Sequence, residues 1–173
     1  WVLQRPEGAI DWYFFGYGND YKKALRDFTS VAGRIPMPPK YAFGYWWSRY
    51  WIYNDDEIRS LVNEMKRFDI PIDVFIIDMD WHETWGLTSM PYKRDFRGWT
   101  GYTWNRRLFP YPEKTLDWLE EQNLKTALNL HPANGIAPME EQYEKFAEVY
   151  GFDTTGHKNI PYNMSDKKWA NTY

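Results

Sequence analysis

From residue 41 onward, strand-like and helix-like segments alternate, and this order restricts the fold more than any other feature. The expected strands are 41–47, 72–78 and 124–131. The expected helices are 54–68, one opening at Pro112, one opening at Pro138, and one over 165–173. Such alternation predicts parallel strands joined by right-handed crossovers. The sheet is then either open and doubly wound or closed into an eight-stranded barrel, and both architectures bind ligands at the carboxyl ends of the strands.

The first forty residues have a different pattern. Residues 11–17 predict a strand, and Asn19 or Asp20 can cap a helix over 21–32. The segment 33–40, "GRIPMPPK", has three prolines in eight residues, which suit neither a helix nor a central strand. We therefore expect a domain boundary here, with 1–34 and 35–173 as the two parts.

The helix expected at 54–68 carries the clearest local signals. Asn54 and Glu57 have the spacing of a capping box. One face of the helix is apolar: Ile58, Leu61, Val62, Met65 and Phe68.

Polar residues follow the second expected strand at once, in "VFIIDMDWHETW", residues 74–85. Asp78, Asp80 and His82 are spaced by two, so they face one way if the backbone stays extended. The two acids can bind hydroxyl groups of a polar ligand. They can instead form a D-x-D metal site with His82 as third ligand, as in metal-dependent glycosyltransferases. They can also be structural, capping the next helix or pairing with an arginine such as Arg94 or Arg97. The spacing leaves all three open.

Aromatic residues are unusually frequent, at 20% of the chain with 11 Trp and 14 Tyr. Nine of them lie in the long connection 79–112, which we expect to fold over the mouth of the sheet. Flat apolar rings beside hydrogen-bonding groups suit sugars, so this composition favours a carbohydrate site. It also leaves open a non-catalytic sugar-binding module.

Other classes of function are disfavoured. The net charge of −3 does not favour nucleic acid, and no apolar run reaches the length of a membrane span. The absence of cysteine excludes disulfides, zinc–thiolate sites and cysteine nucleophiles. There is no phosphate loop or dinucleotide fingerprint, so we expect no cofactor. Residues 1–10 lack the layout of a signal peptide, and the compartment stays open.

Three stretches together resemble glycoside hydrolase family 31, which includes α-glucosidases and α-xylosidases. They are "RIPMPPKYAFGYWWSRYW", "IPIDVFIIDMDWH" and "GWTGYTWNRRLFPYPEKTLDWLEEQNLKTALNLHP". The resemblance implies a (β/α)8 TIM barrel of which this chain holds the first three βα units. It also implies that residues 1–34 are the end of an N-terminal β-sandwich and a connecting helix.

The resemblance further implies a retaining mechanism with an aspartate nucleophile and a second carboxylic acid. Both are expected beyond Tyr173, so no catalytic residue is assigned. Asp78 matches the family's glycone-binding aspartate, with Asp80 and Trp81 on the same wall. Trp46 and Trp47 are expected at the floor, one of them pointing away. The full set of predicted substrate-binding residues is Asp78, Asp80, Trp81, His82, Trp46, Trp47 and Trp85.

We therefore expect a segment of a retaining α-glycosidase whose partners are a carbohydrate and the remainder of the same polypeptide. His82 and the ending "NLHP" depart from the common family pattern, which leaves the sugar open. Because three parallel strands cannot close, we expect the chain alone to be inactive and to aggregate or pair with the remainder.

Overall fold

The structure is a computed structural model that describes residues 12–83 and 100–173. The chain divides into two compact units, one ending at Lys40 and one over Tyr41–Tyr173. The division falls at the end of the proline-rich segment 33–40. The assignment of 1–34 and 35–173 to two domains stays a prediction.

The described part of the first unit, residues 12–40, contains one α-helix, α1 (Tyr21–Ala32), as expected from the sequence. Its N-cap is Asp20, whose carboxylate accepts a hydrogen bond from the Lys23 amide at 3.1 Å. The rings of Phe15 and Phe28 meet edge to face, with centroids 5.9 Å apart.

The strand predicted over 11–17 is wrong for the described residues 12–17, which form no strand. A strand must pair its backbone N–H and C=O groups with a neighbour, and no described segment lies in register with this one. Trp12 and Phe14 are accordingly exposed. The sequence of residues 11–17 predicted a strand, but the described chain supplies no neighbour for it to pair with.

The second unit is built on a parallel sheet of three strands in the order β1 (Trp46–Trp47), β2 (Val74–Ile77) and β3 (Lys125–Leu128). The parallel βα arrangement expected from the sequence is thereby confirmed. Trp46 pairs with Val74, and Ile77 pairs with Leu128.

The first strand is shorter than expected, because residues Lys40–Phe43 form a 3₁₀ turn, η1. The Asp73 carboxylate accepts a hydrogen bond from the Tyr45 amide at 3.0 Å. It also fills the space beside Gly44, where an added Cβ would come within 2.1 Å of it. The ladder between the two segments begins with the pair Trp46 and Val74, and the Val74 amide donates to the Tyr45 carbonyl at 3.1 Å.

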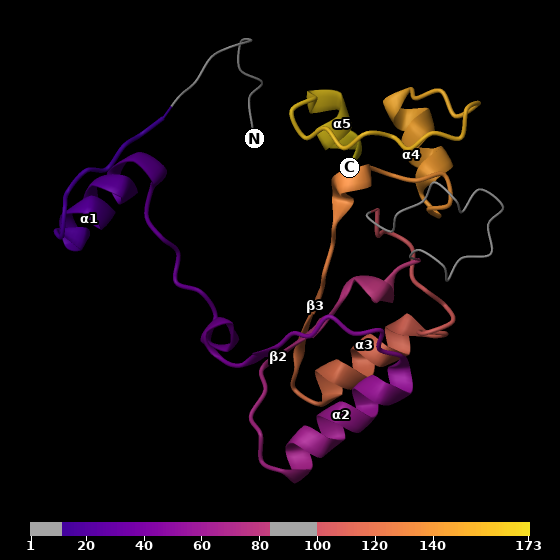
Figure 1. The fold of residues 1–173 in the computed structure, drawn as a ribbon, viewed down its shortest axis with the longest axis horizontal. Coiled ribbons are helices and arrows are strands. Elements are labelled where there is room, and N and C mark those ends of the chain that lie inside the picture. Colours follow the sequence, from indigo (N-terminus) through magenta and orange to yellow (C-terminus); the bar gives the residue numbers. More distant parts are fainter. Residues whose placement is uncertain (1–11, 84–99) are drawn as a thin grey trace. The chain divides into compact units, whose positions relative to one another are not determined.

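Helices α2 (Asp55–Arg67) and α3 (Pro112–Glu121) cover one face of the sheet and lie side by side (Figure 1). The predicted capping box of α2 is present. The Asn54 side chain accepts a hydrogen bond from the Glu57 amide, and the Glu57 carboxylate accepts one from the Asn54 amide at 3.0 Å. The helix-facing core contains Tyr53, Ile58, Val62, Phe75, Ile77, Trp81, Phe109, Leu119 and Leu124.

After β3 the chain forms a 3₁₀ turn, η4 (Pro132–Asn134), and then helices α4 (Tyr143–Tyr150) and α5 (Lys167–Thr172). A second core lies between these helices: Ile136, Tyr143, Phe146, Ala147, Ile160 and Trp169. The helix predicted to open at Pro138 begins only at Tyr143, because residues 137–142 form turns around the buried Glu140.

Within residues 12–83 and 100–173, no helix combines the length and the apolar character needed to cross a membrane.

Candidate functional site

The register of the sheet decides which side chains meet at its carboxyl edge. Phe75 and Ile77 point into the helix-facing core, so Val74, Ile76 and then Asp78 point to the opposite face. Ile77 pairs with Leu128, and the next residue on β3 is Asn129. Asp78 and Asn129 therefore lie side by side on the face that the helices do not cover.

Asp78 is only 7% exposed and accepts two hydrogen bonds on one oxygen. The Asn129 Nδ2 donates to Oδ1 at 2.6 Å, and the Met79 amide donates to the same atom at 2.8 Å. Asp78 thus caps the 3₁₀ turn η2 (Met79–Trp81). Asp78 therefore has a structural role that differs from the predicted one: it caps a 3₁₀ turn and not the next helix, and the side chain that donates to it is an asparagine and not an arginine.

Asp78, Asp80 and His82 would face one way only if the backbone stayed extended, and this condition is not met because η2 begins directly after Asp78. A 3₁₀ turn advances side chains by about one third of a circle per residue, so the alternation of a strand is lost. Asp80 instead lies on the wall of a cavity of about 330 Å³. The other lining residues are Tyr50, Trp51, Ile52 and Glu57.

The cavity wall opposite Asp80 comes from the loop that follows β1. Tyr50 is 72% exposed and Trp51 is 48% exposed, so both rings present apolar surface to solvent. The Arg49 guanidinium lies 4.3 Å from the centre of the Trp51 ring, a cation–π contact that orients the indole. Tyr50 and Trp51 line the cavity together with Asp80, and neither was among the residues predicted to bind substrate.

Trp81 and His82 are buried beneath this surface. The Trp81 Nε1 donates to the Asn129 carbonyl at 2.8 Å, and its ring meets that of Trp104 at 4.8 Å. His82 has no exposed surface, and its Nδ1 lies 2.8 Å from the Glu83 carbonyl oxygen. Burial lowers the pKa of His82, so the ring is neutral at neutral pH.

The segment 100–105 pairs with residues 81–83 through backbone hydrogen bonds and so fixes their position. The Asn105 amide donates to the Trp81 carbonyl, and the Glu83 amide donates to the Thr103 carbonyl, both at 2.8 Å. His82 and Trp104 form the antiparallel bridge between these bonds. This pairing gives the long connection a folded base next to the two acids.

Glu140 ties the same segment to the chain that follows β3. Its carboxylate accepts hydrogen bonds from the Thr100 hydroxyl and, at 3.2 Å, from the Tyr102 amide. The Thr103 hydroxyl in turn accepts from the Glu141 amide at 2.9 Å. Glu140 is 4% exposed, and burial raises its pKa although these hydrogen bonds act in the opposite direction.

Trp46 and Trp47 lie on opposite faces of β1, as the pleat requires. Trp47 packs against the helix-facing core, while Trp46 is 40% exposed and lies on the face of Val74 and Asp78. Trp85, Arg94 and Arg97 lie outside the described residues.

The metal reading of D-x-D needs a third ligand near the two acids. Among residues 12–83 and 100–173, no three His, Asp or Glu side chains gather in a way that could hold a metal ion. The imidazole of His82 is packed against Trp81, with ring centroids 5.2 Å apart.

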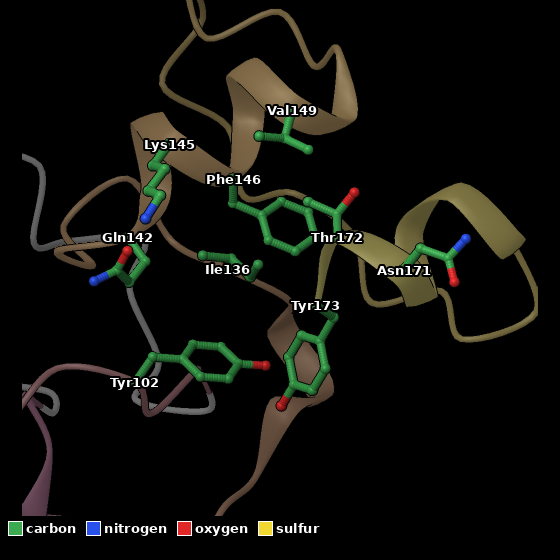
Figure 2. A pocket seen from close by; sticks show the side chains of 9 residues that line it. All are labelled: Tyr102, Ile136, Gln142, Lys145, Phe146, Val149, Asn171, Thr172 and Tyr173. Carbon is green, nitrogen blue, oxygen red and sulfur yellow. The ribbon is translucent and has the colours of Figure 1, made fainter.

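A second cavity, of about 520 Å³, lies between Tyr102 and helices α4 and α5. Figure 2 shows the Tyr102 and Tyr173 side chains turned toward each other at its lower end, and their ring centroids are 5.8 Å apart. Burial and the neighbouring Tyr173 hydroxyl raise the pKa of Tyr102. None of the residues predicted to bind substrate lines this cavity.

Sequence reasoning also missed Asn129 and Glu140. The quoted ending "NLHP" contained Asn129, and the pairing of strands two and three places it beside Asp78, so a register argument could have found it. Glu140 carried no signal, because it stood in a segment predicted to be helical.

Comparison with known proteins gives a consistent result. The family model "Glycosyl hydrolases family 31 TIM-barrel domain" matches residues 35–171. The chain is 29% identical to an alpha-xylosidase from Saccharolobus solfataricus, over 73% of this chain and 16% of that protein. It is 30% identical to alpha-glucosidase 2 from Bacillus thermoamyloliquefaciens, over 72% of this chain and 14% of that protein. The chain thus spans about one sixth of these relatives.

Solved structures agree on the fold. A xylosidase from Aspergillus niger superposes with a TM-score of 0.63 at 17% identity, covering 88% of this chain and 21% of that one. The alpha-xylosidase from Xanthomonas citri gives a TM-score of 0.60 at 17% identity, covering 89% of this chain and 17% of that one. The three-stranded parallel sheet fits this fold, and the family model over residues 35–171 shows that the chain belongs to glycosyl hydrolases family 31 and forms part of its TIM-barrel domain.

Proposed function

We propose that this chain is part of the catalytic barrel of a retaining α-glycosidase and supplies one wall of its glycone pocket. The relatives named alpha-xylosidase and alpha-glucosidase support an α-glucoside or α-xyloside as substrate. Barrel enzymes place their sites at the carboxyl ends of the strands, and Asp78 and Asp80 follow β2 at that end. Residues 1–34 are proposed to end the preceding β-sandwich and connect it to the barrel.

The position of Asp80 carries this proposal. Asp80 lines a cavity of about 330 Å³ together with the exposed rings of Tyr50 and Trp51. A carboxylate accepts hydrogen bonds from sugar hydroxyls, and an aromatic face covers the C–H face of a sugar ring. A small cavity that offers both groups suits a hexose or pentose better than an anionic or purely apolar ligand.

The retaining reaction needs two carboxyl groups about 5–5.5 Å apart across the scissile bond. We assign neither to this chain. One forms the covalent glycosyl-enzyme, and the other protonates the leaving oxygen and then activates water. The residues of this chain hold the sugar in place for those two carboxyl groups. Asp78, Asp80 and Trp46 contact the sugar, and the buried side chains of Trp81 and His82 support them.

The test uses the whole polypeptide that carries this chain. Wild type, Asp78→Asn and Asp80→Asn are assayed with aryl α-glucosides and α-xylosides. Each variant keeps the size of the side chain and loses its charge, so kcat/KM should fall about 10- to 100-fold, the size expected for a hydrogen bond to a charged group. Asp117→Asn, on the exposed face of α3, is the matched control.

Two results would contradict the proposal. One is a wild-type protein that hydrolyses neither type of glycoside. The other is an Asp80→Asn variant whose kcat/KM equals that of Asp117→Asn.

A further inference from the structure

We propose that Asn129 is a positioning residue that orients the Asp78 carboxylate for a substrate hydroxyl. This role rests on the proposed function, because it gives Asp78 a sugar to bind. Asn129 is not among the residues predicted to contact substrate, and it acts through its neighbour.

The backbone of Asn129 is held at both of its polar groups. Its amide donates to the Ile77 carbonyl at 3.0 Å and so continues the β2–β3 ladder by one bond. Its carbonyl accepts from the Trp81 indole at 2.8 Å. The side chain therefore starts from a Cα that the sheet and a buried ring fix together.

The side chain of Asn129 reaches one oxygen of Asp78. Its Nδ2 donates to Oδ1 at 2.6 Å, and the Met79 amide also donates to Oδ1, at 2.8 Å. Neither of these two bonds uses Oδ2. Since a carboxylate is planar, fixing Oδ1 from two directions also fixes where Oδ2 points.

An amide suits this position for an electrostatic reason. Asp78 is 7% exposed, so its charge needs hydrogen-bond donors inside the protein. Arg or Lys would supply them but would also neutralise the carboxylate and compete with a hydroxyl for Oδ2. Asn supplies one donor and adds no charge, so the Asp78 carboxylate stays negatively charged and can accept a hydrogen bond from the ligand.

The same residue also steadies the second acid. Asp80 lies in η2 directly before Trp81, whose indole is bound to the Asn129 carbonyl. Substitution of the Asn129 side chain leaves this backbone bond in place. Variants at position 129 thus report on the bond to Asp78 and not on the position of the turn.

The test compares three variants in the whole polypeptide, with aryl α-glucosides and α-xylosides as probes. Asn129→Ala removes the donor and should lower kcat/KM about tenfold. Asn129→Asp keeps the size and sets a second carboxylate against Asp78, so the loss should be about a hundredfold. Asn63→Asp, on the exposed face of α2, makes the same chemical change away from the site and should leave kcat/KM unchanged.

A double-mutant cycle with Asp78→Ala separates positioning from a general effect on the fold. If Asn129 acts through Asp78, Asn129→Ala should have no further effect in the Asp78→Ala background. The same cycle is measured by calorimetric titration of glucose and xylose, so it does not depend on residual turnover.

Each outcome has a distinct meaning. Equal losses from Asn129→Ala in both backgrounds would show a structural role and overturn the inference. Unchanged kcat/KM in both Asn129 variants of an active enzyme would overturn it while the proposed function stands. A wild-type enzyme without glycosidase activity would overturn the proposed function and this role with it.

Discussion

At the scale of single residues, Gly101 lies close to the buried ring of His82. His82 has no exposed surface, and its imidazole lies against the Gly101 backbone. A Cβ at Gly101 would come within 2.7 Å of Cδ2 and of Nε2, and the backbone φ of +70° is strained for any L side chain. The glycine therefore allows the long connection to close over the histidine.

Gly101→Ala should lower the free energy of unfolding by about 2–4 kcal/mol. The left-handed backbone alone costs about 1–2 kcal/mol, and crowding against a buried ring adds to it. Gly18→Ala is the matched control, because Gly18 has a φ of +55° with nothing within 4 Å of the added Cβ. Urea unfolding of the whole polypeptide measures both, and equal losses would show that the contact with His82 contributes nothing.

At the scale of elements, Glu140 connects the 100–103 segment to the turns before α4. Burial raises its pKa, so the carboxyl holds its proton more tightly in the folded protein than in the unfolded chain. The stability linked to this proton is full below the unfolded pKa and is lost as the pH rises through the higher folded value. The connection between these elements should thus weaken from mildly acidic to neutral pH.

Glu140→Gln should remove this pH dependence, since an amide does not titrate. The melting temperature of wild type relative to Glu140→Gln should be highest near pH 4 and should fall toward pH 7 to 8. Glu144→Gln, in the first turn of α4, is the control. A difference between wild type and Glu140→Gln that stays constant with pH would contradict the assignment.

At the scale of the whole molecule, the three parallel strands described here are part of a barrel that uses eight. Both outer strands of this sheet offer unpaired backbone groups along apolar residues, with Trp46 40% exposed on β1. The rest of a barrel covers such edges.

A polypeptide cut to residues 1–173 should therefore aggregate or bind the remainder of the protein, and should not hydrolyse aryl α-glycosides. Light scattering and an activity assay test this directly. Co-expression with the remainder should restore both solubility and activity. Turnover by residues 1–173 alone would mean that the catalytic pair lies within this chain.

Sequence signals that span a few residues correctly predicted the elements that are stabilised by interactions within those residues. The capping box of Asn54 and Glu57 and the apolar face that follows it belong to one stretch of chain, and α2 forms as expected. The four apolar residues before Asp78 predicted β2 for the same reason. The helix predicted to open at Pro138 begins later because this segment bends around Glu140, whose hydrogen-bond partners Thr100 and Tyr102 lie far away in the sequence.

The sequence by itself therefore determined the order of strands and helices from residue 41 onward, the family, and the carboxyl end of β2 as the place of the acids. Only the tertiary structure decided that Asp78 meets Asn129, that η2 turns Asp80 toward Tyr50 and Trp51, and that His82 is sealed beneath Gly101. The reason is physical: hydrophobic periodicity and capping act over a few residues, whereas strand register and side-chain burial depend on segments about fifty residues apart.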